Sequence, residues 1–205
     1  MCISTLNHLE IAVTARIAPA SMPFDPEVAP LIERVMKGRP PLHLFATLAP
    51  DTRLAKKFFF SGLLDKGHLT IRQREIVIDR TTAMCGSEYE WGVHVTMFGQ
   101  MAGLTEDQVH STAVGCADDP CWSEDERLLI RLCDALHAEC NLDDTLWTEL
   151  TSKFSDEALL ELLMLAGFYR TVAYLTNALR LPLEQGGARF PARSGSSRYA
   201  NRPSK

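Results

Sequence analysis

Three short segments of this sequence carry the pattern that begins an α-helix. In each, a serine or threonine is followed three residues later by glutamine or glutamate, so each side chain can bond a free backbone N–H at the other position. Apolar residues at helical spacing follow these segments, and no stretch alternates in the manner of a strand bounded by turns. The sequence therefore predicts an all-α fold. The three pairs are Thr70 with Gln73, Thr105 with Gln108, and Ser123 with Glu126.

Other capping residues and breakers mark further helices. Prolines enclose the short apolar segment Leu42–Ala49, and Asp51 is placed to cap the helix that follows it. Another helix is expected from near Ser87 to Gly103. Two helices are expected towards the C-terminus: a short one from Asp143 or Asp144, and a long one from Ser155 or Asp156 to Arg180, ended by Pro182.

The chain has 205 residues, of which 46% are hydrophobic, enough for a helical domain with a sizeable core. Residues 1–24 show weak patterning, so we expect an irregular N-terminal segment. We expect residues 25–184 to form the helical domain. Residues 185–205 hold five basic residues and no acid among Gly, Ser and Pro, which predicts a basic disordered tail.

Charge and hydropathy exclude several classes of protein. The net charge is −5, whereas a nucleic-acid-binding protein is more often basic. No uninterrupted apolar run reaches the roughly 20 residues of a membrane span, and the N-terminus lacks the basic start of a signal peptide. Six cysteines without a secretory signal do not imply a disulfide framework. We therefore expect a reduced, cytoplasmic protein with no nucleic-acid partner and no membrane partner.

The most unusual segment is Cys85–His94, which holds a thiol, two acids, two large aromatic side chains and a histidine. On a helix, Ser87, Glu90 and His94 share one face because they are three and four residues apart. A Glu–His pair in a partly apolar site couples two titrations and can relay protons near pH 7. The alternative is an exposed ion pair on a helix surface.

Several motifs together resemble the carboxymuconolactone decarboxylase family, within the broader alkylhydroperoxidase D-like (AhpD-like) superfamily. The resemblance spans roughly residues 35–184. It implies an AhpD-like helical bundle built around a helical hairpin, assembled as a homo-oligomer. The motifs are Arg74–Ile78, Cys85–Trp91, His94, Ala102–Thr105, and the C-terminal segments Gly167–Tyr169 and Asn177–Leu179.

The peroxidase-linked branch of that superfamily has a glutamate nineteen residues before a histidine, with a Cys-x-x-Cys pair between them. Glu75 and His94 match both ends of this pattern, but the two cysteine positions fall on Ser87 and Glu90. A dithiol cycle needs an attacking thiolate and a resolving thiol, and this chain has neither at those positions. Glu90-Trp91 with His94 instead resembles the decarboxylase branch, which lacks the Cys-x-x-Cys pair.

The resemblance implies a lyase without a cofactor that acts on a small carboxylated or lactone substrate. In the namesake reaction a carboxylate is lost, and the remaining electrons are held as an enolate and then protonated. Glu75, Glu90 and His94 are the expected catalytic residues, with His94 as the proton donor and the two glutamates tuning it or acting as base. Tyr89 and Trp91 are expected to bind the substrate.

Two other functions stay open at this stage. Cys85, at the start of a helix, could make the protein a thiol-dependent antioxidant of the alkylhydroperoxidase kind. Alternatively, the helical bundle could be a non-catalytic oligomer that binds an apolar ligand. No metal is expected: Cys133, His137 and Cys140 can share a helix face, but a fourth ligand is not apparent.

Overall fold

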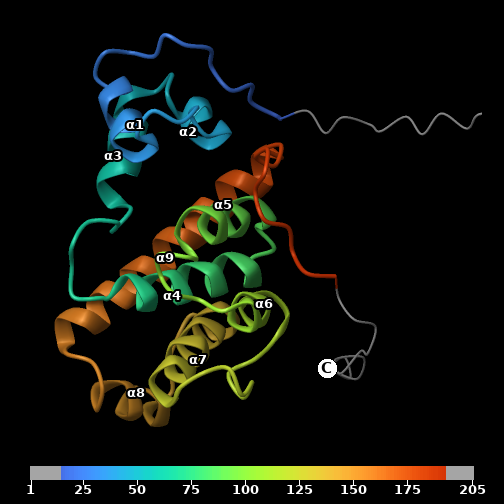
Figure 1. The fold of residues 1–205 in the computed structure, drawn as a ribbon. Helices are drawn as coiled ribbons and strands as arrows, with labels where there is room; N and C mark the ends of the chain where they lie inside the picture. Colours follow the sequence, from blue (N-terminus) through green and yellow to red (C-terminus); the bar gives the residue numbers. More distant parts are fainter. Residues whose placement is uncertain (1–14, 193–205) are drawn as a thin grey trace, which may run out of the picture.

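The structure, a computed structural model, describes residues 15–192. This part of the chain contains nine helices and no strand, which confirms the all-α prediction (Figure 1). The helices are α1 (Ala29–Met36), α2 (His43–Leu48), α3 (Thr52–Ser61), α4 (Ile71–Met84), α5 (Glu88–Phe98), α6 (Glu106–Val114), α7 (Glu124–Glu139), α8 (Asp144–Thr151) and α9 (Asp156–Leu179).

The predicted capping residues begin seven of these helices. All three reciprocal capping pairs form, at the starts of α4, α6 and α7. At the other four starts the cap side chain accepts a hydrogen bond from a backbone N–H, and each such cap is typically worth about 1 kcal/mol. These four caps are Asp51, Ser87, Asp143 and Ser155.

Helix α4 lies at the centre of the bundle and packs against α5, α6, α7 and α9 (Figure 1). Every residue from Glu75 to Thr82 is buried, so this stretch has no solvent-facing side. Ile76, Val77 and Ile78 join the hydrophobic core. The same stretch also brings Glu75, Asp79 and Arg80 into the interior, where each charge must find a partner or be neutralised.

Helices α1, α2 and α3 lie together at one end of the molecule in Figure 1. Phe45, Phe58 and Phe59 pack against one another, and the Phe58 ring lies 5.3 Å from that of Phe168 on α9. The backbone N–H of Leu44 also donates to the Tyr89 hydroxyl, over 3.1 Å. These contacts join the N-terminal helices to α5 and α9.

The two ends of the described chain are irregular but make defined contacts. Residues 15–24 form no helix, and Arg16 bonds the backbone oxygen of Leu179. Residues 185–192, the first part of the predicted tail, run along α5. There the Ala188 N–H donates to Thr96 Oγ1 over 2.9 Å, and a Cβ at Gly92 would collide with the Ala188 carbonyl oxygen. The rest of the predicted tail and residues 1–14 lie outside the described residues.

Helix α9 is long and apolar enough to cross a membrane by length and composition, and it is the only such helix in residues 15–192. From the sequence, no such stretch was expected, because Glu161 and Arg170 interrupt the apolar run. A core helix of a globular protein passes the same test, and Leu162, Leu165 and Val172 of α9 are fully buried. The predictions of a cytoplasmic protein without a membrane partner stay predictions.

Candidate functional site

The turn between α4 and α5 brings the predicted catalytic residues together. Gly86 adopts φ +67°, a conformation that glycine tolerates best, and Ser87 then caps α5. The Ser87 hydroxyl also bonds Thr176 Oγ1 of α9 over 2.8 Å. Because α5 returns along α4, Glu90 and His94 on α5 meet Glu75 on α4.

His94 lies between two carboxylates. Its Nδ1 is 2.7 Å from Glu75 Oε2, and its Nε2 is 3.4 Å from Glu90 Oε1. All three side chains are buried. The sequence-based alternative of an exposed ion pair therefore does not describe this group. Arg74 adds a contact from its Nε to Glu75 Oε1, over 3.3 Å.

The two carboxylates decide the charge of the imidazole. Burial alone would lower the pKa of His94, but Glu75 and Glu90 outweigh that effect and raise its pKa to about 10. At neutral pH the ring is therefore an imidazolium. The Tyr169 ring meets it edge-on at 4.9 Å and Phe98 lies at 5.1 Å, so the charged ring has aromatic neighbours on two sides.

Asp79 is a member of this site that the sequence analysis missed. It lies one turn after Glu75 on α4, is fully buried, and neither carboxyl oxygen has a hydrogen-bond partner among the described residues. Burial raises its pKa well above the ordinary value, and the nearby Glu75 carboxylate raises it further. Both effects favour the neutral form of this carboxyl. The available signal was its spacing of four residues from Glu75.

A cavity of about 490 Å³ opens onto Glu90 and His94. Its walls are mainly apolar, and aromatic rings from α2, α3, α5 and α9 contribute most of them. Charged side chains also line it, two basic and one acidic: Arg34, Lys37 and Asp65. Glu90 Oε2 is buried without a hydrogen-bond partner in the described chain, so the site retains an unused acceptor. The aromatic lining residues are Phe45, Phe58, Phe59, Phe60, Phe98, Phe168 and Tyr169.

The two predicted substrate-binding residues lie elsewhere. Neither Tyr89 nor Trp91 is among the residues that line the cavity. The Tyr89 hydroxyl bonds Glu184, and Trp91 Nε1 donates to Thr112 Oγ1 over 3.0 Å. The Trp91 ring also lies 5.1 Å from that of Phe190. Both side chains therefore support α5, and substrate contact by either one stays a prediction.

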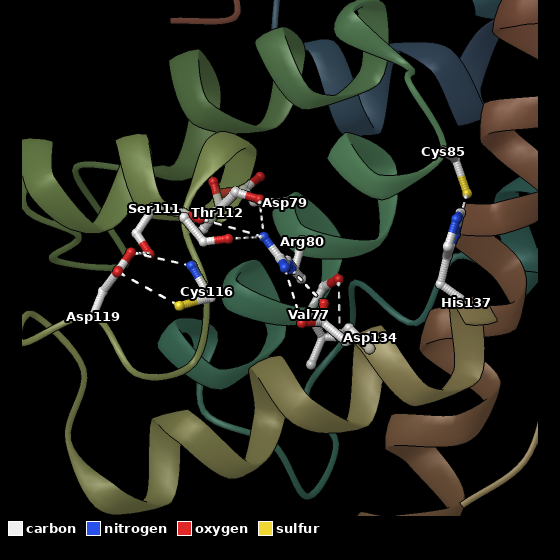
Figure 2. Close-up of polar contacts among 12 residues, drawn as sticks. Val77, Asp79, Arg80, Cys85, Ser111, Thr112, Cys116, Asp119, Asp134 and His137 are labelled. Atoms are coloured by element: carbon white, nitrogen blue, oxygen red, sulfur yellow. Dashed lines mark hydrogen bonds and ion pairs between the residues drawn. The ribbon is translucent and has the colours of Figure 1, made fainter. Parts of the chain in front are cut away.

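Cys85 lies apart from the cavity, at the end of α4. Its Sγ is 3.9 Å from His137 Nδ1 on α7, as Figure 2 shows. Burial raises the pKa of this thiol, and the nearby Arg170 only partly opposes the rise. Cys85 is therefore a weaker candidate for a reactive thiolate than its place before a helix suggested.

No group of three or more His, Cys, Asp or Glu side chains in residues 15–192 is placed to hold a metal ion. Cys133 is buried, with its Sγ directed at the Val77 carbonyl oxygen, whereas Cys140 is exposed. The shared helix face of Cys133, His137 and Cys140 does not become a metal centre in this part of the chain.

Comparison with solved structures identifies the architecture. An uncharacterized peroxidase-related protein from Silicibacter sp. TM1040 matches with a TM-score of 0.73 at 16% identity, covering 86% of this chain and 94% of its own. A candidate antioxidant defence protein AhpD of unknown function from Agrobacterium tumefaciens matches with a TM-score of 0.57 at 22% identity, covering 69% and 96%. The fold is AhpD-like.

A cysteine-to-alanine variant of the debrominase Bmp8, in complex with 2,3,4-tribromopyrrole, has the same helical architecture. It matches with a TM-score of 0.68 at 15% identity, covering 82% of this chain and 91% of its own. No family model matches the chain, and no curated protein matches it. The fold is thus shown, while the narrower resemblance to carboxymuconolactone decarboxylases is not.

Proposed function

We propose that this protein is an acid–base enzyme that decarboxylates or isomerises a small, largely apolar substrate bearing a carboxylate or lactone. One observation carries the proposal: His94 is held as an imidazolium between Glu75 and Glu90 at an apolar cavity. A charged proton donor in a site of low polarity acts strongly on a developing negative charge.

The three side chains have distinct roles in this proposal. Glu75, at hydrogen-bond distance from Nδ1, orients the ring, as a carboxylate does for a catalytic histidine. Nε2 faces Glu90 over a longer distance, so it is the nitrogen that can turn its proton to a substrate. Glu90 Oε2 is the free acceptor that takes a proton back.

The decarboxylation step balances without an added oxidant or reductant. The bond between the carboxylate carbon and its neighbour breaks, CO₂ leaves, and the electron pair moves into the adjacent carbonyl as an enolate. His94 then protonates the enolate carbon from Nε2, and a proton from solvent, taken up by Glu90 Oε2, returns to the ring. Apolar walls favour loss of the carboxylate charge, while Arg34 and Lys37 attract the anion to the cavity.

The debrominase complex supports a small cyclic molecule as the ligand of this cavity. In that protein an AhpD-like fold holds a small substituted ring. The cavity here is of a size suited to small molecules and is lined by aromatic rings.

The experiment is a screen of the purified protein with β-keto acids and carboxylated lactones, following CO₂ release and ring opening. We expect Glu90→Gln, which preserves shape and the Glu75–His94 pair, to lower kcat and shift its pH profile. His94→Gln removes the proton donor and should lower kcat by about 10² to 10⁴-fold, whereas Cys85→Ser should leave turnover unchanged. Full turnover in folded Glu90→Gln and His94→Gln would refute the proposal.

A thiol-dependent antioxidant activity has one observation in its favour, the contact between Cys85 and His137. Dimedone labelling under peroxide tests it, with intact mass measured on the wild type and on Cys85→Ser. A label confined to Cys85 would support this second function. We expect no label at that position, because burial raises the pKa of the thiol.

A further inference from the structure

The tyrosines in the described part of the chain differ in how their hydroxyl groups are bonded. The Tyr89 hydroxyl bonds Glu184, and the exposed Tyr174 accepts a hydrogen bond from Arg170 Nε over 2.8 Å. Tyr169 is only 2% exposed, yet no hydrogen bond joins its hydroxyl to another described residue. A buried tyrosine hydroxyl usually has a partner, so this one is a candidate to bind a ligand.

Tyr169 lines the cavity that opens onto Glu90 and His94. It belongs to the core face of α9, one turn after the buried Leu165 and Ala166, and α9 packs against α5. The Tyr169 ring meets the His94 ring edge-on, with centroids 4.9 Å apart. Tyr169 therefore borders the same space as the proposed proton donor.

Neighbouring rings hold the Tyr169 ring in place. Phe168 packs edge-on against it at 5.4 Å, and Phe58 of α3 packs in turn on Phe168 at 5.3 Å. A hydrogen-bond donor fixed in this way needs little reorganisation when negative charge develops beside it.

The surroundings of Tyr169 keep its hydroxyl protonated. Burial raises the pKa of the phenol well above its ordinary value, and Glu90 and Glu75 raise it further, whereas Arg74 partly opposes the rise. The hydroxyl can therefore donate a hydrogen bond at physiological pH without giving up its proton.

The proposed decarboxylation forms an enolate with two reactive ends, and the roles assigned so far serve only its carbon. The oxygen end gains negative charge and needs a donor, because an unpaired charge between apolar walls is costly. Arg34 and Lys37 also line the cavity, but both are exposed, so water screens their charges. Tyr169 is a buried donor at the same cavity, beside His94.

We propose that Tyr169 donates a hydrogen bond to the carbonyl oxygen of the substrate and stabilises the charge that this oxygen gains as CO₂ leaves. The electron pair of the broken carbon–carbon bond moves towards that oxygen, and the phenolic O–H bond stays intact. The carbonyl re-forms when His94 protonates the enolate carbon. This inference rests on the proposed function. It narrows the substrate class to β-keto acids and to lactones with a carboxylate next to the ring carbonyl, because this spacing directs the electron pair to the carbonyl oxygen.

The first test is ligand binding, which needs no turnover. The oxygen of 4-nitrophenolate mimics an enolate oxygen, and nitrobenzene has the same ring without it. At pH 9, calorimetry should show that the wild type binds 4-nitrophenolate at least tenfold more tightly than nitrobenzene, as expected for a hydrogen bond to a charged oxygen. Tyr169→Phe should lose this preference and bind nitrobenzene as the wild type does.

Three results of the binding test would overturn the proposal. The first is a wild type without preference for 4-nitrophenolate. The second is an unchanged affinity for 4-nitrophenolate in Tyr169→Phe. The third is an equal loss of affinity for both ligands in Tyr169→Phe, which would indicate that the residue only shapes the cavity.

The second test compares stability, because a hydroxyl that serves a ligand does not support the fold. Tyr169→Phe should unfold at the same urea concentration as the wild type or at a higher one. Tyr89→Phe should unfold at a lower concentration, since its hydroxyl bonds Glu184 and the backbone N–H of Leu44. An equal fall in both variants would show that the Tyr169 hydroxyl is structural and would contradict the proposal.

The third test uses a β-keto acid that the wild type turns over. Tyr169→Phe should lower kcat by about 10²-fold with little change in KM, because the hydrogen bond strengthens as the oxygen becomes charged. Tyr174→Phe, on the same helix but outside the cavity, should leave kcat unchanged. Full kcat in Tyr169→Phe would refute its role and leave that of His94 standing. Selective binding of 4-nitrophenolate without any turnover would instead refute the proposed function and leave Tyr169 as an oxyanion donor.

Discussion

Helix α4 carries two clusters of buried charge, and they differ in how fully their polar atoms are bonded. One is the His94 cluster, formed by Glu75 and Asp79 of α4 with Glu90 and His94 of α5. The other is the arginine cluster, in which Arg80 meets Asp134 of α7 and the end of α6. The first leaves several oxygens without partners in the described chain and opens on a cavity. The second does neither.

Figure 2 shows how completely Arg80 is bonded. Its Nε and Nη2 reach the two carboxylate oxygens of Asp134 over 2.6 and 2.9 Å. Its Nη1 is shared among three backbone carbonyl oxygens, of Ser111, Thr112 and Gly115. A guanidinium bonded in this way fixes α4 to α6 and α7, because four of its five N–H groups have acceptors on those elements or on the turn after α6.

The comparison separates two uses of buried charge. A well-bonded cluster holds elements together, whereas unpaired buried oxygens cost stability, and the one on Glu90, at the cavity, is a candidate for binding or proton transfer. The contrast is physical and does not rest on the superfamily. Four predictions test it, beginning with the largest expected effect.

The first prediction concerns turnover. His94→Gln should lower kcat by about 10² to 10⁴-fold, the usual range for loss of a general acid. Arg80→Met should leave kcat per folded molecule unchanged, because Arg80 does not line the cavity. Steady-state rates at a temperature where both variants are folded provide the measurement. A similar fall in both variants would break the comparison.

The second prediction concerns stability. Arg80→Met removes the partner of Asp134 and of three carbonyls, so unfolding should cost about 3 kcal/mol less, near the low end for a broken buried pair because Asp134 is partly exposed. Arg131→Met is the control, since Arg131 and Glu149 form a surface pair worth less than about 1 kcal/mol. Urea denaturation measures both. Equal losses would show that the arginine cluster is not structural.

The third prediction concerns pH. Folding raises the pKa of His94 to about 10, so the charged ring stabilises the folded state. This stabilisation is complete below the pKa of the unfolded chain, near 6.5, and is lost as pH rises through 10. The free energy of unfolding should therefore fall between these values in the wild type and in Arg80→Met. Urea titrations at several pH values should show a shallower fall in His94→Gln. An unchanged slope in His94→Gln would contradict the charge assigned to this ring.

The fourth and smallest effect concerns Asp79. Because the pKa of Asp79 is raised in the folded state, folding takes up a proton at this carboxyl. The cost of burying the carboxyl therefore grows as pH rises above the ordinary pKa of an aspartate. Asp79→Asn removes that cost and should stabilise the protein at pH 8, by less than Arg80→Met destabilises it. The gain should shrink towards pH 4, as thermal melts at both pH values can show. A loss of stability at pH 8 would mean that Asp79 is charged and paired.

Much of the fold could be predicted from the sequence because most of its helices begin at side-chain caps. Helix α1 was not predicted because it has no capping side chain. Its N-cap residue, Val28, makes no side-chain hydrogen bond. Helix α9 was predicted, but the side of it that faces the core was not, because an apolar helix shows this only once its neighbours are placed.

The site was predictable only in part, for a similar reason. The meeting of Glu90 and His94 follows from helical spacing, and the family resemblance pointed to Glu75. Asp79 was missed because a carboxyl in an apolar stretch gives no sign of whether its neighbours bond it. Tyr89 and Trp91 lie beside Glu90 in sequence, yet a helix turns adjacent residues in different directions, and both side chains point to structural partners.

The segment 185–192 along α5 has a practical consequence for work on this protein. Phe190 packs on Trp91, and the backbone N–H of Phe190 bonds Glu88, so the C-terminal segment lies on the helix that carries His94. A chain cut before residue 185 would uncover Trp91, whose fluorescence would report the loss. An affinity tag is therefore better fused to the N-terminus.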